Sequence, residues 1–212
     1  MQRAEVRAAP PPAAGADEDR PFVDRAVAGD AEAFEALVRR YQGWVFTLAL
    51  RMLGDRGEAE DAAQEVFLKA YRGLKSFRGA SRFSTWLYAI ASHHCVNHAQ
   101  ALGRRPRPRG GGGGGSPGGD DPPDPVDRLP DGAPRADALL EQADRDRIVH
   151  RELQHLTPEH RAVLTLRDIQ GLTYEEIAQA LGLELGTVRS RLHRARMEMK
   201  ARLAPHLGLG DA

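Results

Sequence analysis

A stretch rich in glycine and proline divides the chain into two blocks that can fold. Residues 103–134 hold 10 glycines and 8 prolines in 32 positions, including six consecutive glycines at 110–115. This composition cannot bury a core, and a flexible segment of this length spans on the order of 30 Å on average. We therefore expect two small domains, at 22–105 and 138–203, that move semi-independently about a flexible acidic linker over 106–137.

The ends of the chain and its composition favour a soluble protein. Residues 1–21 are rich in alanine and proline and lack an apolar period, so we expect a disordered tail there and a short tail over 204–212. No stretch approaches the roughly 20 apolar residues needed to span a bilayer. Cys95 is the only cysteine, which excludes an intrachain disulfide. A cytoplasmic protein without direct membrane insertion is expected.

Charge is segregated along the chain although the formal net charge is zero. Residues 22–109 carry 14 basic against 9 acidic side chains, whereas residues 110–137 carry 2 against 6. Within 187–202 the ratio is 6 basic to 1 acidic. Positive charge focused on one helix favours a polyanionic partner such as nucleic acid.

Apolar residues recur at three- and four-residue steps in the first block, as amphipathic helices require. Asp30 is the expected N-cap of a long helix that ends at Gly54. A second helix opens with the acidic residues of 58–61, where negative charge favours a helix N-terminus. After a loop at 77–81, a third helix runs to about Gly103. The expected fold class is all-α.

The second block carries clear helix boundaries. Thr and Pro at 157–158 fit the cap and first position of a helix. Thr173 and Glu176 form a capping-box pattern that opens a short helix ending at Gly182. The last helix begins near Gly186 and places its apolar residues on one face. Those residues are Val188, Leu192, Ala195 and Met199.

Two helices joined by a glycine-containing turn match helix-turn-helix geometry, in which the second helix enters the major groove. An ordinary helical hairpin with a solvated basic face is the plainer alternative. The side chains opposite the apolar face, and so expected at base edges, are Ser190, His193 and Arg194. The expected phosphate contacts are Arg189, Arg191 and Arg196. Thr187, at the start of the helix, is a further expected DNA contact.

Three runs of sequence resemble the bacterial RNA polymerase sigma-70 family. They are EAEDAAQEVFLKAY (58–71), SFRGASRFSTWLYAIA (76–91) and LTPEHRAVLTLRDIQGLTYEEIAQALGLELGTVRSRLHRARMEMK (156–200). Two folded domains with only a linker between them is the organisation of its extracytoplasmic-function (ECF) group. The resemblance implies a region 2 helical bundle, a region 4 helix-turn-helix, and a dissociable promoter-specificity subunit that has neither catalysis nor a cofactor.

The family resemblance also implies a division of roles. The second domain would read the −35 promoter element as duplex, while the first would bind core polymerase and capture the melted −10 element. Asp61, Gln64 and Glu65 match the family's DxxQE surface, which docks on the β′ clamp coiled coil. Exposed acids near a helix N-terminus also stabilise the helix itself, and both roles stay open.

Strand capture needs aromatic faces and cations that hold unstacked bases. For Phe83 and Trp86 the spacing fits the buried stripe of the third helix equally well, so core packing is the alternative. The candidates for the −10 strand are Phe77, Arg78, Phe83, Trp86, His93, Asn97, Arg104 and Arg105, beside Tyr88, Arg107 and Arg109.

One position departs from the family pattern: His93 stands where members usually carry an asparagine that helps to hold a flipped base. The base preference that the family implies is therefore open. His94, Cys95 and His98 also suggest a small metalloenzyme, but no fourth ligand is evident and the cysteine is rotated away from the pair. A conventional helix-turn-helix activator is a further alternative, and it would need a sensing or dimer module in the first half of the chain.

The family implies several partners: core RNA polymerase through its β′ clamp and β subunit, promoter DNA, and an anti-sigma factor. It also implies that the linker threads toward the RNA exit channel of the polymerase. A solubilising spacer is the plainer reading of the same segment. The acidic residues concerned are Asp120, Asp121, Asp124, Asp127 and Asp131.

Overall fold

The computed structural model describes residues 18–79, 81–104 and 136–207, which form helices and turns without a strand. The all-α expectation is confirmed, and none of these helices is long and apolar enough to cross a bilayer. Nearly all of the expected linker lies outside the described residues. The helical segments are α1 (Arg20–Val27), α2 (Ala31–Leu53), α3 (Arg56–Gly73), η1 (Leu74–Ser76), α4 (Phe83–Arg104), α5 (Ala136–Leu153), α6 (Pro158–Leu164), η2 (Thr165–Ile169), α7 (Tyr174–Leu181), α8 (Leu185–Leu203) and η3 (Ala204–Leu207).

The long helix α2 is defined by its two ends. The Asp30 carboxylate accepts hydrogen bonds from the backbone N–H groups of Glu32 and Ala33 at 3.0 and 3.2 Å, which satisfies donors that a helix start leaves open. Gly54 has a φ of +83°, and its N–H donates to the Leu50 carbonyl at 2.9 Å. Glycine adopts this left-handed conformation without strain. Both predicted boundaries are confirmed.

The folded part starts earlier than the sequence indicates, because residues 18–21 of the expected tail are ordered beside α2. Asp19 is buried, and its carboxylate accepts hydrogen bonds from Arg40 at 2.6 Å and from the Tyr41 hydroxyl. Burial, together with this carboxylate, raises the pKa of Tyr41 far above its usual range. The pairing joins residues more than twenty positions apart, so no local pattern reveals it. At the other end, η3 gives the expected 204–212 tail a helical start.

The first half is a small bundle in which α2 packs against α1, α3 and α4. Tyr41 and Phe83 pack with ring centroids 5.7 Å apart, and Trp44 and Tyr88 with centroids 4.0 Å apart. These four aromatic side chains are buried and account for much of its core.

The second half consists of α5 to α8, and its caps agree with the sequence. Thr157 caps α6 by accepting from the His160 N–H at 3.3 Å. The capping box is complete: the Thr173 hydroxyl accepts from the Glu176 N–H at 3.2 Å, and the Glu176 carboxylate accepts from the Thr173 N–H at 2.8 Å. Gly182 ends α7 in the left-handed region with a φ of +63°. Helix α8 starts at Leu185, one residue before the expected position.

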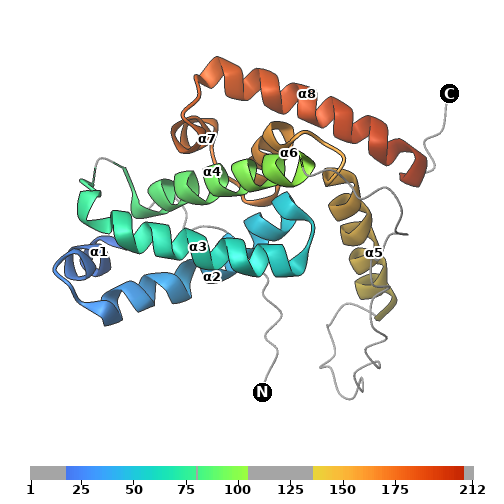
Figure 1. Ribbon diagram of the computed structural model, residues 1–212. Helices are drawn as coiled ribbons and strands as arrows, with labels where there is room; N and C mark the ends of the chain where they lie inside the picture. The colour runs from blue at the N-terminus through green and yellow to red at the C-terminus, as the bar shows by residue number, and fades with distance from the viewer. Residues whose placement is uncertain (1–17, 80, 105–135, 208–212) are drawn as a thin grey trace.

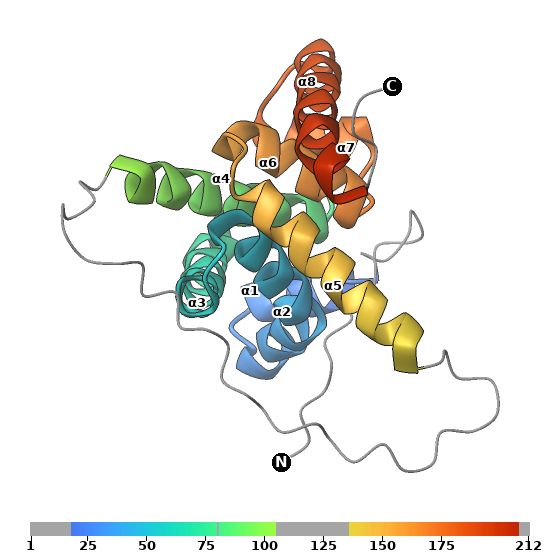
Figure 2. The same ribbon diagram turned by 90° about the vertical axis from the view of Figure 1, so that its right-hand side faces the viewer.

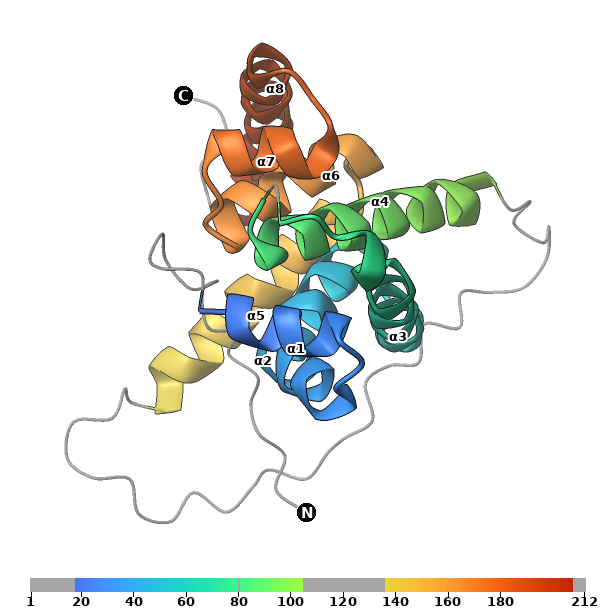
Figure 3. The ribbon, with the colours of Figure 1, turned by 90° about the vertical axis from the view of Figure 1, so that its left-hand side faces the viewer.

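The two halves pack against each other, which differs from the expected semi-independent domains. Helix α4 lies against α6 and α7, and the end of α2 lies against α5, α6 and η2. In Figure 1, α6, α7 and α8 form a layer above α4, and Figure 2 shows α5 running past α2. Figure 3 shows α7 directly over the start of α4. The apolar stripes of both halves join in one cluster of buried side chains, which a sequence period cannot predict.

Candidate functional site

Helix α8 presents one buried face and one charged face, as the sequence predicts. The apolar residues Val188, Leu192, Ala195 and Met199 are buried against the rest of the second half. On the other side Arg189, Ser190, His193 and Arg194 are exposed, while Thr187 and Arg191 are half-buried. Helix α7 packs against α8 across the Gly182 turn, as a helix-turn-helix requires.

The cations of α8 differ in their freedom to bind a ligand. Arg189, Arg191 and Arg194 make no ion pair with any described residue. In contrast, Arg196 binds both carboxylate oxygens of Asp168 on η2, at 3.0 and 2.5 Å. The Asp168 hydrogen bond raises the pKa of Arg196 and neutralises its charge locally. Arg196 therefore has to exchange an existing partner before it can bind a phosphate.

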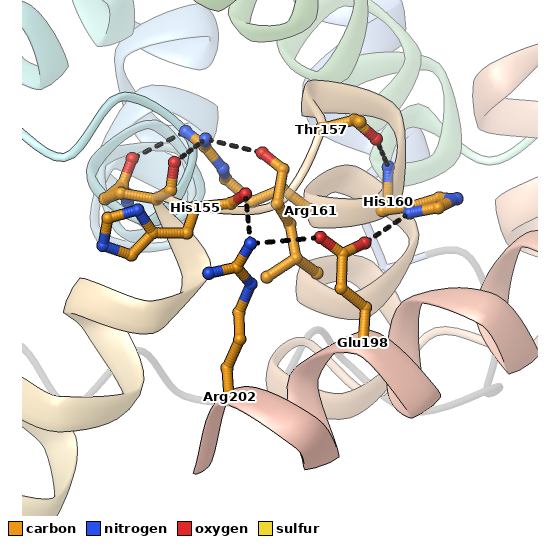
Figure 4. Close-up of polar contacts among 8 residues, drawn as sticks. His155, Thr157, His160, Arg161, Glu198 and Arg202 are labelled. Atoms are coloured by element: carbon orange, nitrogen blue, oxygen red, sulfur yellow. Dashed lines mark hydrogen bonds and ion pairs between the residues drawn. The ribbon is translucent and has the colours of Figure 1, made fainter.

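Polar side chains connect the C-terminal half of α8 to α6 and to the turn that precedes α6 (Figure 4). Glu198 lies 3.1 Å from the Nδ1 atom of His160 and 3.5 Å from Arg202. Arg202 in turn donates to the His155 carbonyl at 3.3 Å. These contacts fix α8 relative to α6, so the exposed N-terminal half of α8 is held in one orientation.

A groove between α3 and α4 gathers several of the predicted strand-binding residues. Trp86, His93 and Asn97 line it, all three from α4. Lys69 of α3 lies in the same groove with its Nζ atom 2.6 Å from the Nδ1 atom of His94. Burial and this ammonium lower the pKa of His94, so its ring is neutral and accepts from the lysine. The sequence did not predict a role for Lys69 in strand binding, because its pattern indicates only a polar position on an amphipathic helix.

The aromatic residues near this groove divide between core and surface. Phe83 is only 1% exposed, so the alternative of core packing holds for it and a base cannot stack there. Tyr88 is equally buried. Phe77 and Trp86 are half-buried with ring centroids 5.1 Å apart, and each keeps part of its surface open. Phe83 is buried because it is the first residue of α4 and lies on the face of that helix that packs against the core.

Two of the predicted cations, Arg78 and Arg104, belong to the described residues, and neither lines the groove. Arg78 is exposed in the loop before α4, and Arg104 is exposed at the last turn of that helix. Arg105, Arg107 and Arg109 lie outside the described residues.

His94, Cys95 and His98 do not come together as a metal site. Cys95 is fully buried, and burial raises its pKa to about 12. His98 contacts Glu58 at 2.5 Å, and His94 faces the Lys69 ammonium, which disfavours a cation. Within the described ranges no three His, Cys, Asp or Glu side chains gather in a way that could hold a metal ion.

Asp61, Gln64 and Glu65 are exposed on one side of α3. Gln64 also borders apolar grooves between α2 and α3, which Phe46, Phe67 and other side chains line. Leu68 and Tyr71 on α3 are 46% and 54% exposed, a large fraction for apolar side chains. Acidic and apolar surface side by side is typical of a protein-docking face. The sequence identified the acids but not the neighbouring apolar groove.

Comparisons with known proteins agree with this architecture. The sequence matches the family descriptions "Sigma-70 region 2" over residues 37–105 and "Sigma-70, region 4" over residues 146–199. It is 41% identical over 196 residues to the RNA polymerase sigma-H factor of Pseudomonas aeruginosa, covering 90% of this chain and 96% of that one. It is 38% identical over 192 residues to the ECF RNA polymerase sigma-E factor of Escherichia coli, covering 88% and 95%.

Solved structures with similar folds include CnrH in complex with the cytosolic domain of CnrY. That match has a TM-score of 0.60 at 26% identity and covers 88% of this chain and 97% of CnrH. The sigma factor RpoE of Bartonella quintana, in complex with the anti-sigma factor NepR, shares the fold with a TM-score of 0.57 at 21% identity, over 82% and 98% of the two chains. Both sequence and fold thus show that the chain belongs to the sigma-70 family, in its ECF group, and is a sigma factor for promoter-specific transcription.

Proposed function

We propose that this sigma factor joins core RNA polymerase and directs initiation by reading the −35 element as duplex and holding the melted −10 element. In this proposal it performs no catalysis and needs no cofactor. Strand opening is driven by binding energy, because unpaired bases gain stacking and charge contacts on the protein.

Duplex reading is assigned to the N-terminal half of α8. Thr187, Ser190, His193 and Arg194 lie on the side away from the core, where a major groove could receive them. Arg189 and Arg191 flank them as cations that have no ion-pair partner among the residues described by the structure, which suits phosphate contacts. A bidentate arginine–guanine contact is worth about 1–3 kcal/mol of discrimination.

Strand capture is assigned to the groove between α3 and α4. It combines the Trp86 ring, the Lys69 cation and the polar edges of His93 and Asn97 within one hollow. Aromatic stacking is worth about 1–3 kcal/mol per base, and a nearby cation binds the strand backbone. His93 replaces the family's usual asparagine here, so we expect an altered base preference at the position that it contacts.

Polymerase docking is assigned to the exposed acids Asp61 and Glu65 together with Gln64 and the apolar groove beside it. This face lies on α3, the helix whose other residues help to form the strand-capture groove. The β′ clamp coiled coil is the expected partner of this face, and the β subunit is a further expected partner of the chain. An anti-sigma factor is the expected regulator, since the sigma factor RpoE of Bartonella quintana, which shares this fold, was solved in complex with the anti-sigma factor NepR.

The observation that carries the proposal is the pair of separate nucleic-acid surfaces, one suited to duplex on α8 and one suited to single strand between α3 and α4. The test uses holoenzyme reconstituted from core polymerase and this chain on a promoter fragment. Permanganate reactivity of unpaired thymines reports melting, and a gel shift reports total binding.

We expect Asn97→Ala and Trp86→Ala to reduce permanganate reactivity more than complex formation. Arg194→Ala should instead reduce complex formation, with melting per complex unchanged. Arg39→Ala is the matched control, since Arg39 is an exposed arginine of α2 whose one ion pair within the described part of the chain is with Glu35. If all of these variants behave like the control, the assignment of the two surfaces is wrong.

A further inference from the structure

Helix α1 is fixed to the rest of the first half by the residue that precedes it. The buried Asp19 carboxylate accepts hydrogen bonds from Arg40 at 2.6 Å and from the Tyr41 hydroxyl, and both partners belong to α2. Val23 and Ala26 of α1 are buried as well. Helix α1 therefore has one orientation relative to α2, and the residue after Asp19 is held in place.

Arg20, that next residue, lies against the loop that joins η1 to α4. Helix α1 packs on η1, and in Figure 1 α1 and this loop lie at the same end of the first half. Gly79 of the loop has a φ of +69°, and a Cβ atom there would stand 2.6 Å from the Nη1 atom of Arg20. The absence of a side chain at this position lets the guanidinium approach the loop backbone closely.

The Arg20 side chain keeps hydrogen-bond donors available in this position. Its Nε atom donates to both carboxylate oxygens of Asp24 at 3.0 and 3.1 Å, one turn farther along α1. Its two Nη groups make no hydrogen bond to a described residue. The pair is open to solvent, since 56% and 62% of the two side chains are exposed. A guanidinium that is held at Nε and open at its Nη groups can donate two hydrogen bonds to a phosphate.

The same loop connects Arg20 with the strand-capture groove. Phe77 packs against Trp86 with ring centroids 5.1 Å apart, and Trp86 lines the groove. Arg78 is exposed between Phe77 and Gly79. Beyond Trp86, a surface of aromatic rings and cations therefore continues through the loop to the Arg20 guanidinium.

The length of the groove indicates that a captured strand extends past it. From Trp86 to Asn97, α4 rises about 17 Å at about 1.5 Å per residue. Phosphates of one stacked strand follow one another at about 3.4 Å, so this length holds about five nucleotides. A longer strand leaves the groove, and the end at Trp86 leads onto the loop. A phosphate that passes there meets Arg78 and Arg20.

We propose that Arg20 binds a phosphate of the captured −10 strand where that strand passes from the groove onto the loop around Gly79. This inference deepens the proposed function and rests on it, because it makes α1 part of the surface that holds single-stranded DNA. The match to sigma-70 region 2 begins at residue 37, so the family resemblance assigns α1 no such role. An exposed ion pair within one helix is the plainer account of Arg20, and it predicts no contact with DNA.

The test uses a single-stranded oligonucleotide that carries the non-template −10 region of a promoter mapped by run-off transcription. In each member of a series, one phosphate is replaced by an uncharged methylphosphonate, and fluorescence anisotropy measures the affinity of holoenzyme. Arg20→Ala is expected to weaken binding of the fully charged strand about three- to tenfold, and to reduce the slope of log affinity against log salt by about 0.7. It should also become insensitive to replacement of one phosphate at which the chain with Arg20 loses affinity.

Three further variants separate a phosphate contact from a structural role of Arg20. Asp24→Asn removes the acid that holds the Nε atom and should strengthen strand binding about twofold at low salt. Arg20→Lys keeps the charge but not the two-pronged donor, so it should recover part of the lost affinity. Arg39→Ala, which removes another exposed arginine of the first half, is the matched control and should leave both the affinity and the phosphate profile unchanged.

Unchanged strand binding by Arg20→Ala overturns the proposal. So does weaker binding by Asp24→Asn, or a loss in Arg20→Ala that leaves sensitivity at every phosphate as before. Trp86→Ala is the reference for the proposed function. If Trp86→Ala weakens strand binding and Arg20→Ala does not, this inference alone fails, and if neither variant changes the affinity, the assignment of strand capture to the groove fails with it.

Discussion

Breaking the Asp168–Arg196 pair should strengthen promoter binding, because it releases a cation on the DNA-facing helix. The pair is bidentate, at 2.5 and 3.0 Å, but both side chains are partly exposed, at 38% and 48%. Exposed ion pairs are worth about 0.2–1 kcal/mol, so Asp168→Asn should have a small cost in stability. It removes one negative charge near the phosphates and frees Arg196 to contact one of them.

The size of the effect follows from salt dependence. One added phosphate contact steepens the slope of log affinity against log salt by about 0.9. We expect Asp168→Asn to raise the affinity of holoenzyme for a promoter fragment about three- to fivefold at low salt, with the gain shrinking as salt rises. The assay is fluorescence anisotropy of a labelled fragment over a salt series.

Arg194→Ala and Arg196→Ala provide the comparison within the same experiment. Arg194 is exposed and has no ion pair with a described residue, so its loss should cost about 1–3 kcal/mol of binding free energy. Arg196 first has to leave Asp168, so its loss should cost less than about 1 kcal/mol. Equal losses for the two arginines would refute this reasoning. Weaker binding by Asp168→Asn would refute it as well.

Two further predictions concern the first half. Asp61→Ala should weaken association with core polymerase several-fold, because it removes an exposed acid from the docking face, and it should leave the salt dependence of DNA binding unchanged. Glu32→Ala removes another exposed acid and is the control. If Asp61→Ala leaves the affinity for polymerase unchanged, the assignment of the docking face is wrong. Cys95 has its pKa raised by burial to about 12, so its contribution to stability is present below about pH 8.5 and is lost as pH rises through about 12. Thiol reagents should therefore modify Cys95 at pH 8 only after urea unfolds the chain, and rapid modification of the folded protein would contradict its burial.

Much of this fold could be predicted because its boundaries are local chemistry. Four helix ends are capped through contacts within a few residues, so the sequence pattern predicts them. The capping residues are Asp30, Gly54, Thr173 and Gly182. The faces of α8 follow from a 3.6-residue period alone. The family resemblance supplied the division into regions 2 and 4, which the comparisons confirm.

The features that escaped prediction depend on contacts between distant residues. Arg161 belongs to the short helix α6, and an arginine there is expected to face solvent. In the structure it is buried against the end of α2. Asp168 and Arg196 are 28 positions apart, so their pairing has no sequence signal. The sequence alone allowed Phe83 to lie either in the core or on the surface. Its packing against Tyr41 in the structure places it in the core.

Run-off transcription with purified core polymerase on fragmented genomic DNA tests the central claim most directly. The chain is expected to direct initiation at a defined set of start sites, and Arg194→Ala is expected to reduce transcription from those sites about tenfold or more at limiting holoenzyme. A chain that neither joins core polymerase nor produces discrete transcripts would contradict the account.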